Sequence, residues 1–147
     1  MIRVLAFGVF DLLHPGHIAF LKQAKRLGDG RTPTEASELV VVVTRDEVVE
    51  REKGRKPKLL AKERVTLITG VRWVDRAVIG DPPSKYFSVI RRFRPDVIAV
   101  GYDQPCNVPA FRVMLRSLGL PRTRVVRLKE HRGHRYHSSV LAAPPSS

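Results

Sequence analysis

Residues 2–17, IRVLAFGVFDLLHPGH, combine the features that decide how this chain folds and where it binds. The apolar run at 2–7 is typical of a buried strand. Pro15 suits the first turn of a helix, because proline lacks an N–H that this turn does not use and its φ is already set. The stretch therefore predicts a strand, a short loop and a helix that starts near Pro15.

The same alternation of strand-like and helical patterns continues along the chain. Strands are predicted at 2–7, 38–44, 74–79, 96–100 and 124–128, and helices at 18–27, 62–69, 84–93 and 109–118. Continuous apolar runs such as VVVV and VIAV are typical of strands buried on both faces, and helical crossovers favour parallel pairing. We expect one α/β domain over residues 1–141, a doubly wound, Rossmann-like parallel sheet of five strands with helices on both faces.

Composition narrows the class of protein. The 147 residues fit one domain, and no uncharged run approaches the roughly 18 residues of a membrane span. The N-terminus lacks the features of a secretory signal, so a soluble, cytoplasmic protein with no membrane partner is expected.

A polar loop is predicted at 28–37, and a disordered tail at 142–147, AAPPSS. The single cysteine, Cys106, matches no metal spacing and is predicted to be a spectator or an oxidisable thiol.

The charge of +13 favours an anionic partner without separating nucleic acid from a nucleotide or a phosphorylated metabolite. Ligands of open parallel sheets bind beyond the carboxyl ends of the strands, where the HPGH segment lies. Free N–H groups and the positive dipole end of the new helix would attract an anion there. Gly8 and Gly16 would let phosphate approach the backbone, and His14 and His17, one helical turn apart, would donate to its oxygens.

Two other readings of the histidine pair stay open. His14 and His17 could bind zinc, although no cysteine or third histidine lies near and Asp11 alone completes no familiar ligand set. They could also be surface residues without a role. A phosphate site accounts for the proline, both glycines and both histidines together. The chain lacks the P-loop and G-x-G-x-x-G patterns, which argues against those two nucleotide-binding designs.

These residues also carry a family resemblance. GVFDLLHPGH resembles the G-x-F-D-x-x-H-x-G-H signature of the nucleotidyltransferase superfamily, which includes cytidylyltransferases and small adenylyltransferases. Further segments resemble the archaeal FAD synthase branch in order and spacing: TRDE at 44–47, KGRKP at 53–57, ER at 63–64, VD at 74–75 and PDVIAVGYDQ at 95–104. The likeness covers roughly residues 1–140, and GYDQ best separates this branch from glycerol-phosphate cytidylyltransferases.

The resemblance implies an FMN adenylyltransferase that makes FAD and pyrophosphate from ATP and FMN, with His14, His17 and Lys53 as catalytic residues. It also implies further nucleotide contacts at Gly8, Val9, Phe10, Pro15, Gly16, Tyr102, Asp103, Arg135, Ser138 and Ser139. Position 9 is valine where relatives usually carry threonine or serine, which removes a hydroxyl but leaves the backbone N–H. The last three residues come from RGHRYHSS at 132–139, which departs from the family's C-terminal signature.

The segment 51–58, REKGRKPK, predicts a mobile basic loop that closes over the triphosphate. A solvated charge run or a nucleic-acid contact is the alternative. A divalent ion, most simply Mg²⁺, is expected on the phosphates. Asp11 is a candidate to support that ion or the histidines, and capping a helix accounts for it equally well.

Two rival functions remain. One is a cytidylyltransferase that acts on glycerol 3-phosphate or a related phosphorylated alcohol. The other is a basic module that binds RNA or DNA without catalysis, although the chain lacks a nucleic-acid motif and interleaved aromatic residues. A homodimer is a further expectation, because relatives are commonly dimeric.

Overall fold

The structure is a computed structural model that describes residues 1–28, 37–85 and 87–129. The strands are β1 (Ile2–Gly8), β2 (Ser37–Val43), β3 (Arg76–Ile79), β4 (Val97–Val100) and β5 (Arg124–Arg127). The helices are α1 (Pro15–Leu27), α2 (Asp46–Lys53), α3 (Ala61–Thr69), the 3₁₀ helix η1 (Pro83–Lys85), α4 (Ser88–Phe93) and α5 (Val108–Ser117). The predicted tail, the inner part of the 28–37 loop, and Arg135, Ser138 and Ser139 lie outside the described residues.

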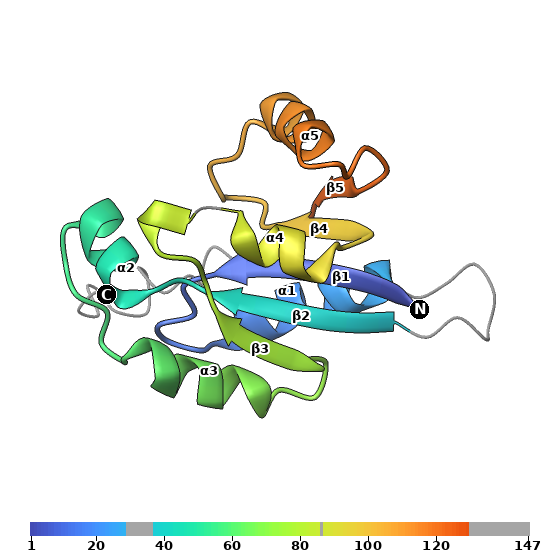
Figure 1. Ribbon diagram of the computed structural model, residues 1–147. Helices are drawn as coiled ribbons and strands as arrows, with labels where there is room; N and C mark the ends of the chain where they lie inside the picture. Colours follow the sequence, from blue (N-terminus) through green and yellow to red (C-terminus); the bar gives the residue numbers. More distant parts are fainter. Residues whose placement is uncertain (29–36, 86, 130–147) are drawn as a thin grey trace.

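All neighbouring strands pair in parallel, in the order β3-β2-β1-β4-β5 (Figure 1). Ala6 in β1 lies opposite Val41 in β2 and Ala99 in β4, so β1 is central. The chain first extends the sheet to one side of β1 and then returns to the other side. The strand order therefore reverses between β1 and β4, where open α/β sheets bind their ligands.

Alternating side chains along the strands build an apolar layer on each face of the sheet. Val4 and Ala6 pack with Leu21 of α1 and Ile68 of α3 on one face. On the other face, Leu5 packs in a second cluster, with residues of α4 and α5. The predicted doubly wound sheet with helices on both faces is confirmed, and all five predicted strands are present.

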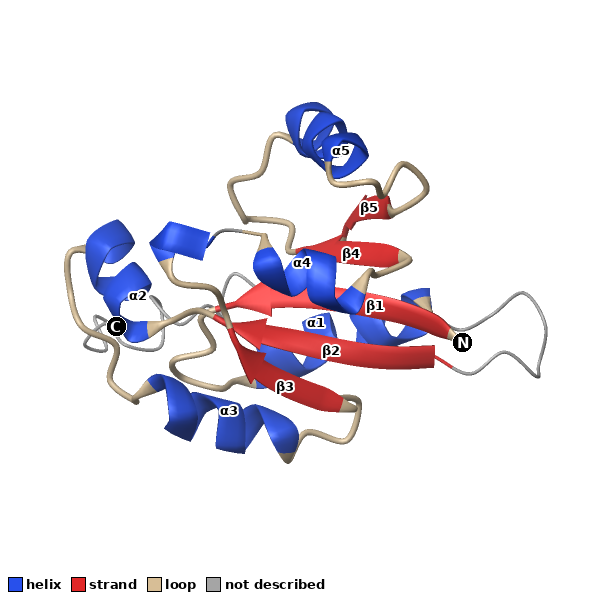
Figure 2. Ribbon diagram, viewed as in Figure 1, coloured by secondary structure: helices blue, strands red, loops and turns tan. Residues whose placement is uncertain are grey.

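Helix α2 differs from the expectation. The first three residues of the predicted basic loop, 51–53, belong to this helix, which extends beyond the strand ends (Figure 2). Acidic residues occupy its first turn and basic residues its last, as the helix dipole favours. Gly54 ends it with φ 70°, a left-handed conformation that glycine adopts at little cost. Within the described ranges, no helix has the length and apolarity needed to cross a membrane.

Candidate functional site

A cavity of about 580 Å³ opens beyond the carboxyl ends of β1, β2 and β4. This volume lies in the usual range for small-molecule sites. The structure brings together three segments that are separate in sequence: the β1–α1 loop, the end of α2 with the basic residues after it, and the loop after β4. The predicted residues that line the cavity are Gly8, Val9, Phe10, Asp11, His14, Gly16, His17, Lys53, Tyr102 and Asp103. Pro15 is exposed at the start of α1 and does not line it.

His14 is the N-cap of α1. Its backbone is extended, and its Nδ1 accepts a hydrogen bond from the Gly16 N–H at 3.1 Å. Only 8% of the residue is exposed. Because Nδ1 is the acceptor, the neutral ring carries its proton on Nε2. The cap therefore fixes both the position of the ring and the nitrogen that can donate.

The imidazole of His17 stacks on that of His14. Their ring centroids lie 3.7 Å apart and their planes are inclined by 22°. Phe10 contacts His17 edge to face, with centroids 5.4 Å apart. Both residues line the cavity, so an anion bound there can accept a hydrogen bond from each ring. The pair is thus arranged to favour a negative ligand.

The first turn of α1 corrects the expectation of free N–H groups. The Gly16 N–H bonds the His14 side chain, and the His17 N–H bonds the His14 carbonyl oxygen at 2.9 Å. Both donors are engaged because a histidine cap and a tight first turn use them locally. The helix still directs its positive dipole end at the cavity, with no acidic residue in its first turn. Side chains, more than backbone donors, are left to contact an anion.

The structure also explains why position 8 is a glycine, which the sequence did not show. A Cβ placed on Gly8 would lie 2.5 Å from Cε2 of Phe10, a separation that real contacts do not tolerate. Phe10 itself has φ 53°, an unfavourable value for an aromatic residue. The residue is 5% exposed, and its ring packs on His17 and Phe20. The missing Cβ of Gly8 therefore makes room for the ring of Phe10.

Asp11 anchors the far end of the basic segment. Its two carboxylate oxygens accept from the backbone N–H groups of Lys58 and Leu59 at 2.8 and 2.9 Å. It caps no helix in the described part of the chain, since His14 occupies the cap of α1. The residues between Lys53 and Lys58 are thus held at one end by α2 and at the other by Asp11. Lys53, Arg55 and Lys56 line the cavity from there.

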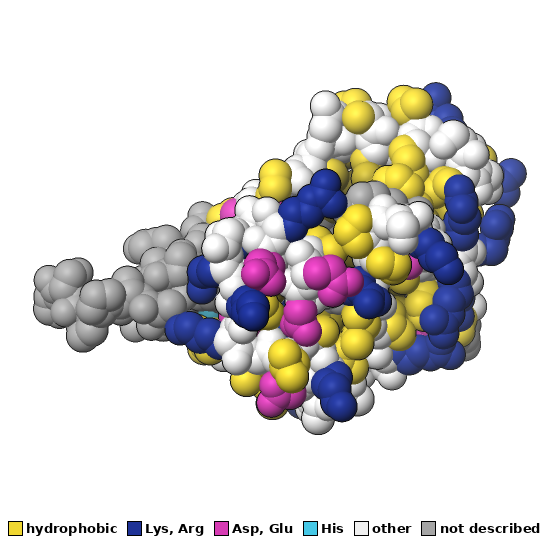
Figure 3. Space-filling view, turned by 60° about the vertical axis from the view of Figure 1, so that its left-hand side comes forward, with side chains coloured by type: hydrophobic (Ala, Val, Ile, Leu, Met, Phe, Trp, Pro, Cys, Tyr) yellow, Lys and Arg dark blue, Asp and Glu magenta, His cyan; other side chains and the backbone are white. Residues whose placement is uncertain are grey.

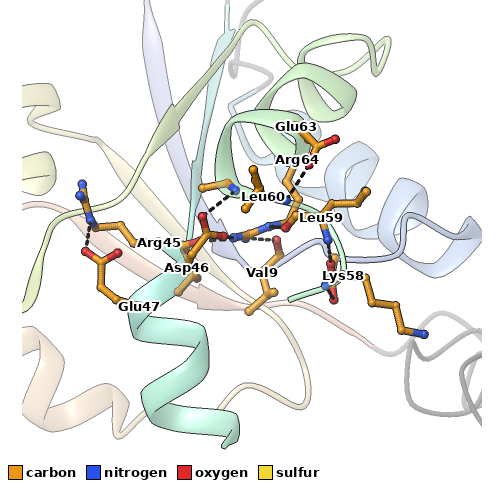
Figure 4. Close-up of polar contacts among 12 residues, drawn as sticks. Val9, Arg45, Asp46, Glu47, Lys58, Leu59, Leu60, Glu63 and Arg64 are labelled. Carbon is orange, nitrogen blue, oxygen red and sulfur yellow. Dashed lines mark hydrogen bonds and ion pairs between the residues drawn. The ribbon is translucent and has the colours of Figure 1, made fainter. Parts of the chain in front are cut away.

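Arg64 is a functional candidate that the sequence reasoning did not find beyond the family resemblance. Its guanidinium, fully buried, donates to the carbonyl oxygens of Leu59, Val9 and Thr44 at 3.0, 2.8 and 2.8 Å (Figure 4). It also bonds the Asp46 carboxylate at 2.7 Å. One side chain therefore joins the loop after β1, the end of β2, the start of α2 and the segment before α3.

Asp46 completes this connection. Its second carboxylate oxygen accepts from the Ala61 N–H at 3.2 Å, so the first residue of α2 is tied to the first residue of α3. A buried guanidinium is costly unless its donors are bonded, and here all three of its nitrogens are bonded. The network fixes α2, and with it Lys53, relative to the loop that carries His14.

Charges are unevenly spread over the molecule. Figure 3 brings the left-hand side of Figure 1 forward and shows a group of Asp and Glu side chains near the middle of the view, with Lys and Arg side chains around them and along the right-hand side. At the start of α2, the Arg45 guanidinium bonds Glu47 at 2.7 Å and lowers the pKa of this exposed carboxyl. The described ranges contain no group of three or more His, Cys, Asp or Glu side chains that could hold a metal ion.

Comparison with known proteins places the chain in a family. The family model of cytidylyltransferase-like proteins matches residues 5–141, so the chain belongs to the cytidylyltransferase-like family. A curated relative, the FAD synthase of Pyrococcus abyssi, is 45% identical over 127 residues, which cover 86% of this chain and 80% of the relative. The FAD synthase of Archaeoglobus profundus is 41% identical over 140 residues, covering 95% and 83% of the two chains.

A solved structure agrees with this assignment. The crystal structure described as the lipopolysaccharide core biosynthesis protein from Thermoplasma volcanium is 38% identical, with a TM-score of 0.77. The match covers 89% of this chain and 98% of that one. The resemblance inferred from GVFDLLHPGH is therefore confirmed at the level of the family and its fold. The roles of the individual site residues remain predictions.

Proposed function

We propose that this protein is an FMN adenylyltransferase, which forms FAD and pyrophosphate from ATP and FMN. The observation that carries the proposal is the meeting of the stacked His14 and His17 with Lys53 in one cavity at the β1/β4 switch point. Curated FAD synthases that are 40–46% identical support the choice of substrates.

The reaction forms one bond and breaks one. A phosphate oxygen of FMN attacks the α-phosphorus of ATP, and the bond from that phosphorus to the oxygen bridging to the β-phosphorus breaks. Pyrophosphate leaves with the electron pair of that bond. No covalent bond to the protein is needed, so the protein acts by positioning the substrates and by stabilising the charge that develops on the leaving group.

The residues of this chain fit that task. His14 donates from Nε2 and His17 from the adjacent ring to phosphate oxygens of the triphosphate. Lys53 and the basic residues that follow it contact the triphosphate from the opposite wall. Tyr102 and Asp103, on the loop after β4, contact the nucleoside. ATP and FMN are both anions, which agrees with the net charge of +13.

We propose that the divalent ion enters with the substrate as a complex of Mg²⁺ with the phosphates of ATP. Both carboxylate oxygens of Asp11 accept backbone hydrogen bonds, which gives this residue a structural role in holding the basic segment. The described residues also offer no cluster of three metal ligands. The ion would then screen phosphate charge, while the protein side chains orient the triphosphate.

The assignment is tested by a matrix of substrates. Purified protein is incubated with ATP or CTP against FMN or glycerol 3-phosphate, and released pyrophosphate and the nucleotide products are quantified. Turnover with ATP and FMN alone supports the proposal. Turnover only with CTP and glycerol 3-phosphate would replace it with the cytidylyltransferase reading. Salt-dependent RNA binding without turnover of any pair would favour a binding module.

The cellular location and the oligomeric state of the protein stay predictions. One is a cytoplasmic location and the other is a homodimer. Sedimentation equilibrium of the full chain would measure the mass in solution directly. A mass of 16.6 kDa corresponds to one chain and would overturn the dimer, and twice that mass would support it.

A further inference from the structure

The loop after β4 forms one wall of the cavity without regular secondary structure. It contributes residues 101–105 to the lining, including Tyr102 and Asp103. A loop of this kind has many conformations open to it, and holding one of them costs conformational entropy. The side chains of two other residues, Arg127 and Gln104, hold the loop in a single conformation. They bond it from opposite sides.

Arg127, the last residue of β5, holds the loop from the outer side. Its Nη1 donates to the carbonyl oxygens of Gly101 and Gln104 at 2.9 and 2.8 Å, and its Nη2 donates to that of Cys106 at 2.9 Å. These carbonyl groups mark the start, the middle and the end of the loop. The rigid, planar guanidinium suits this arrangement, because its donors keep fixed directions.

Gln104 holds the loop from the inner side. Its Oε1 accepts from the Gly101 N–H at 2.6 Å, and its Nε2 donates to the carbonyl oxygen of Phe7 at 3.0 Å. Phe7 is in β1, the strand that leads to the histidine pair. A Cβ on Gly101 would lie 3.3 Å from the Gln104 side chain, so glycine permits the tight fold. The loop is thus clamped between β1 and β5.

Arg127 does not line the cavity, although the loop that it clamps does. Strand pairing sets its position, because Arg127 lies opposite Val100, the residue before the loop. A displacement of Arg127 would therefore reach the cavity only through the loop. His14, His17 and Lys53 belong to other elements and would keep their places.

We propose that Arg127 is a positioning residue for nucleoside recognition: it holds Tyr102 and Asp103 where they select the base and ribose of the nucleotide. The inference rests on the proposed function. Binding and selectivity for the nucleotide depend on Arg127, whereas the rate of the chemical step at saturation depends on His14 and His17, the proposed donors to the leaving group.

The test compares Arg127→Met, Arg127→Lys and the control Arg124→Met. Arg124 is exposed on the same strand, and its side chain makes no hydrogen bond to a residue that the structure describes. kcat and KM are measured for ATP and for CTP at saturating FMN, together with the affinity for ATP by calorimetry. Arg127→Met should raise the KM for ATP on the order of tenfold and lower the preference for ATP over CTP, with kcat within about threefold of wild type.

Arg127→Lys keeps the charge but cannot reach three carbonyl groups at once. Its KM for ATP should therefore fall between that of wild type and that of Arg127→Met. It also serves as the test should Arg127→Met not fold, and an unchanged KM in Arg127→Lys would then overturn the role. In a folded Arg127→Met, wild-type KM and nucleotide preference would overturn it, as would a proportionate loss of kcat with both nucleotides. A wild-type protein that makes no FAD would instead overturn the proposed function.

Discussion

The imidazoles of His14 and His17 stack with their centroids 3.7 Å apart, and the first of them also caps the helix that carries the second. One residue therefore has a structural and a proposed catalytic function, and suitable substitutions separate the two. His17→Ala should lower kcat on the order of a hundredfold or more, because a donor to the charge that develops in the transition state is lost. Circular dichroism and the thermal midpoint should stay near wild type.

His14→Asn and His14→Ala form the matched pair. Asparagine is a good N-cap, so His14→Asn should retain stability and lose activity. His14→Ala should lose activity and also about 1 kcal/mol of unfolding free energy. Near wild-type turnover in His17→Ala or His14→Asn would remove the phosphate role from that residue.

Lys53 offers a prediction about the basic wall. Lys53→Met should raise the KM for ATP about tenfold through loss of a charged contact to phosphate, with little change in the thermal midpoint. Arg51→Met is the control, because Arg51 belongs to the same helix but does not line the cavity. Steady-state kinetics and thermal melts distinguish the two. If Lys53→Met changed stability but not the KM, Lys53 would be a solvated surface charge and not a contact to the triphosphate.

Arg64 offers a prediction about stability. Arg64→Met removes four hydrogen bonds and leaves the Asp46 carboxylate without its ion pair. The expected loss is about 3–5 kcal/mol, and at about 2–4 °C per kcal/mol the thermal midpoint should fall by roughly 10 °C. Asp46→Asn keeps an acceptor for Arg64 and should lose about half as much. A melting curve for Arg64→Met that matched wild type would contradict the role of this network.

Gly8 and Phe10 can be tested together. Gly8→Ala should cost about 1–3 kcal/mol because its Cβ would overlap the ring of Phe10. A Gly8→Ala, Phe10→Leu double variant should lose less unfolding free energy than the sum of the losses in the two single variants, because the smaller side chain leaves room for the new Cβ. Gly70→Ala is the control, with φ −78° and a Cβ no closer than 3.4 Å to its neighbours. Strict additivity in urea denaturation would show that Gly8 and Phe10 do not interact.

The sheet and most of its helices were predictable, because burial leaves a plain pattern in the sequence. The run at 40–43 is apolar throughout, as a strand covered on both faces requires, and Leu39, Val41 and Val43 face one layer while Val40 and Val42 face the other. Pro15 indicated the start of α1, and the structure begins the helix there.

Other features depend on tertiary contacts that no local pattern shows. Helix α2 has only Val48 and Val49 buried among its eight residues, too few to give a helical periodicity. Arginine is rarely buried, so nothing in the spacing indicated that Arg64 would be fully enclosed. Its burial requires acceptors from distant segments, which only the folded chain brings together. The engagement of Asp11 with residues 58 and 59 is of the same kind.

Isotope transfer follows the attack by the FMN phosphate on the α-phosphorus of ATP. Wild-type protein is incubated with FMN, Mg²⁺ and ATP labelled with ³²P at either the α or the γ position, and the products are separated by chromatography. If FMN attacks the α-phosphorus, the α-label appears in FAD and the γ-label in pyrophosphate. A γ-label in the flavin product, or no labelled flavin while CTP and glycerol 3-phosphate react, would contradict it.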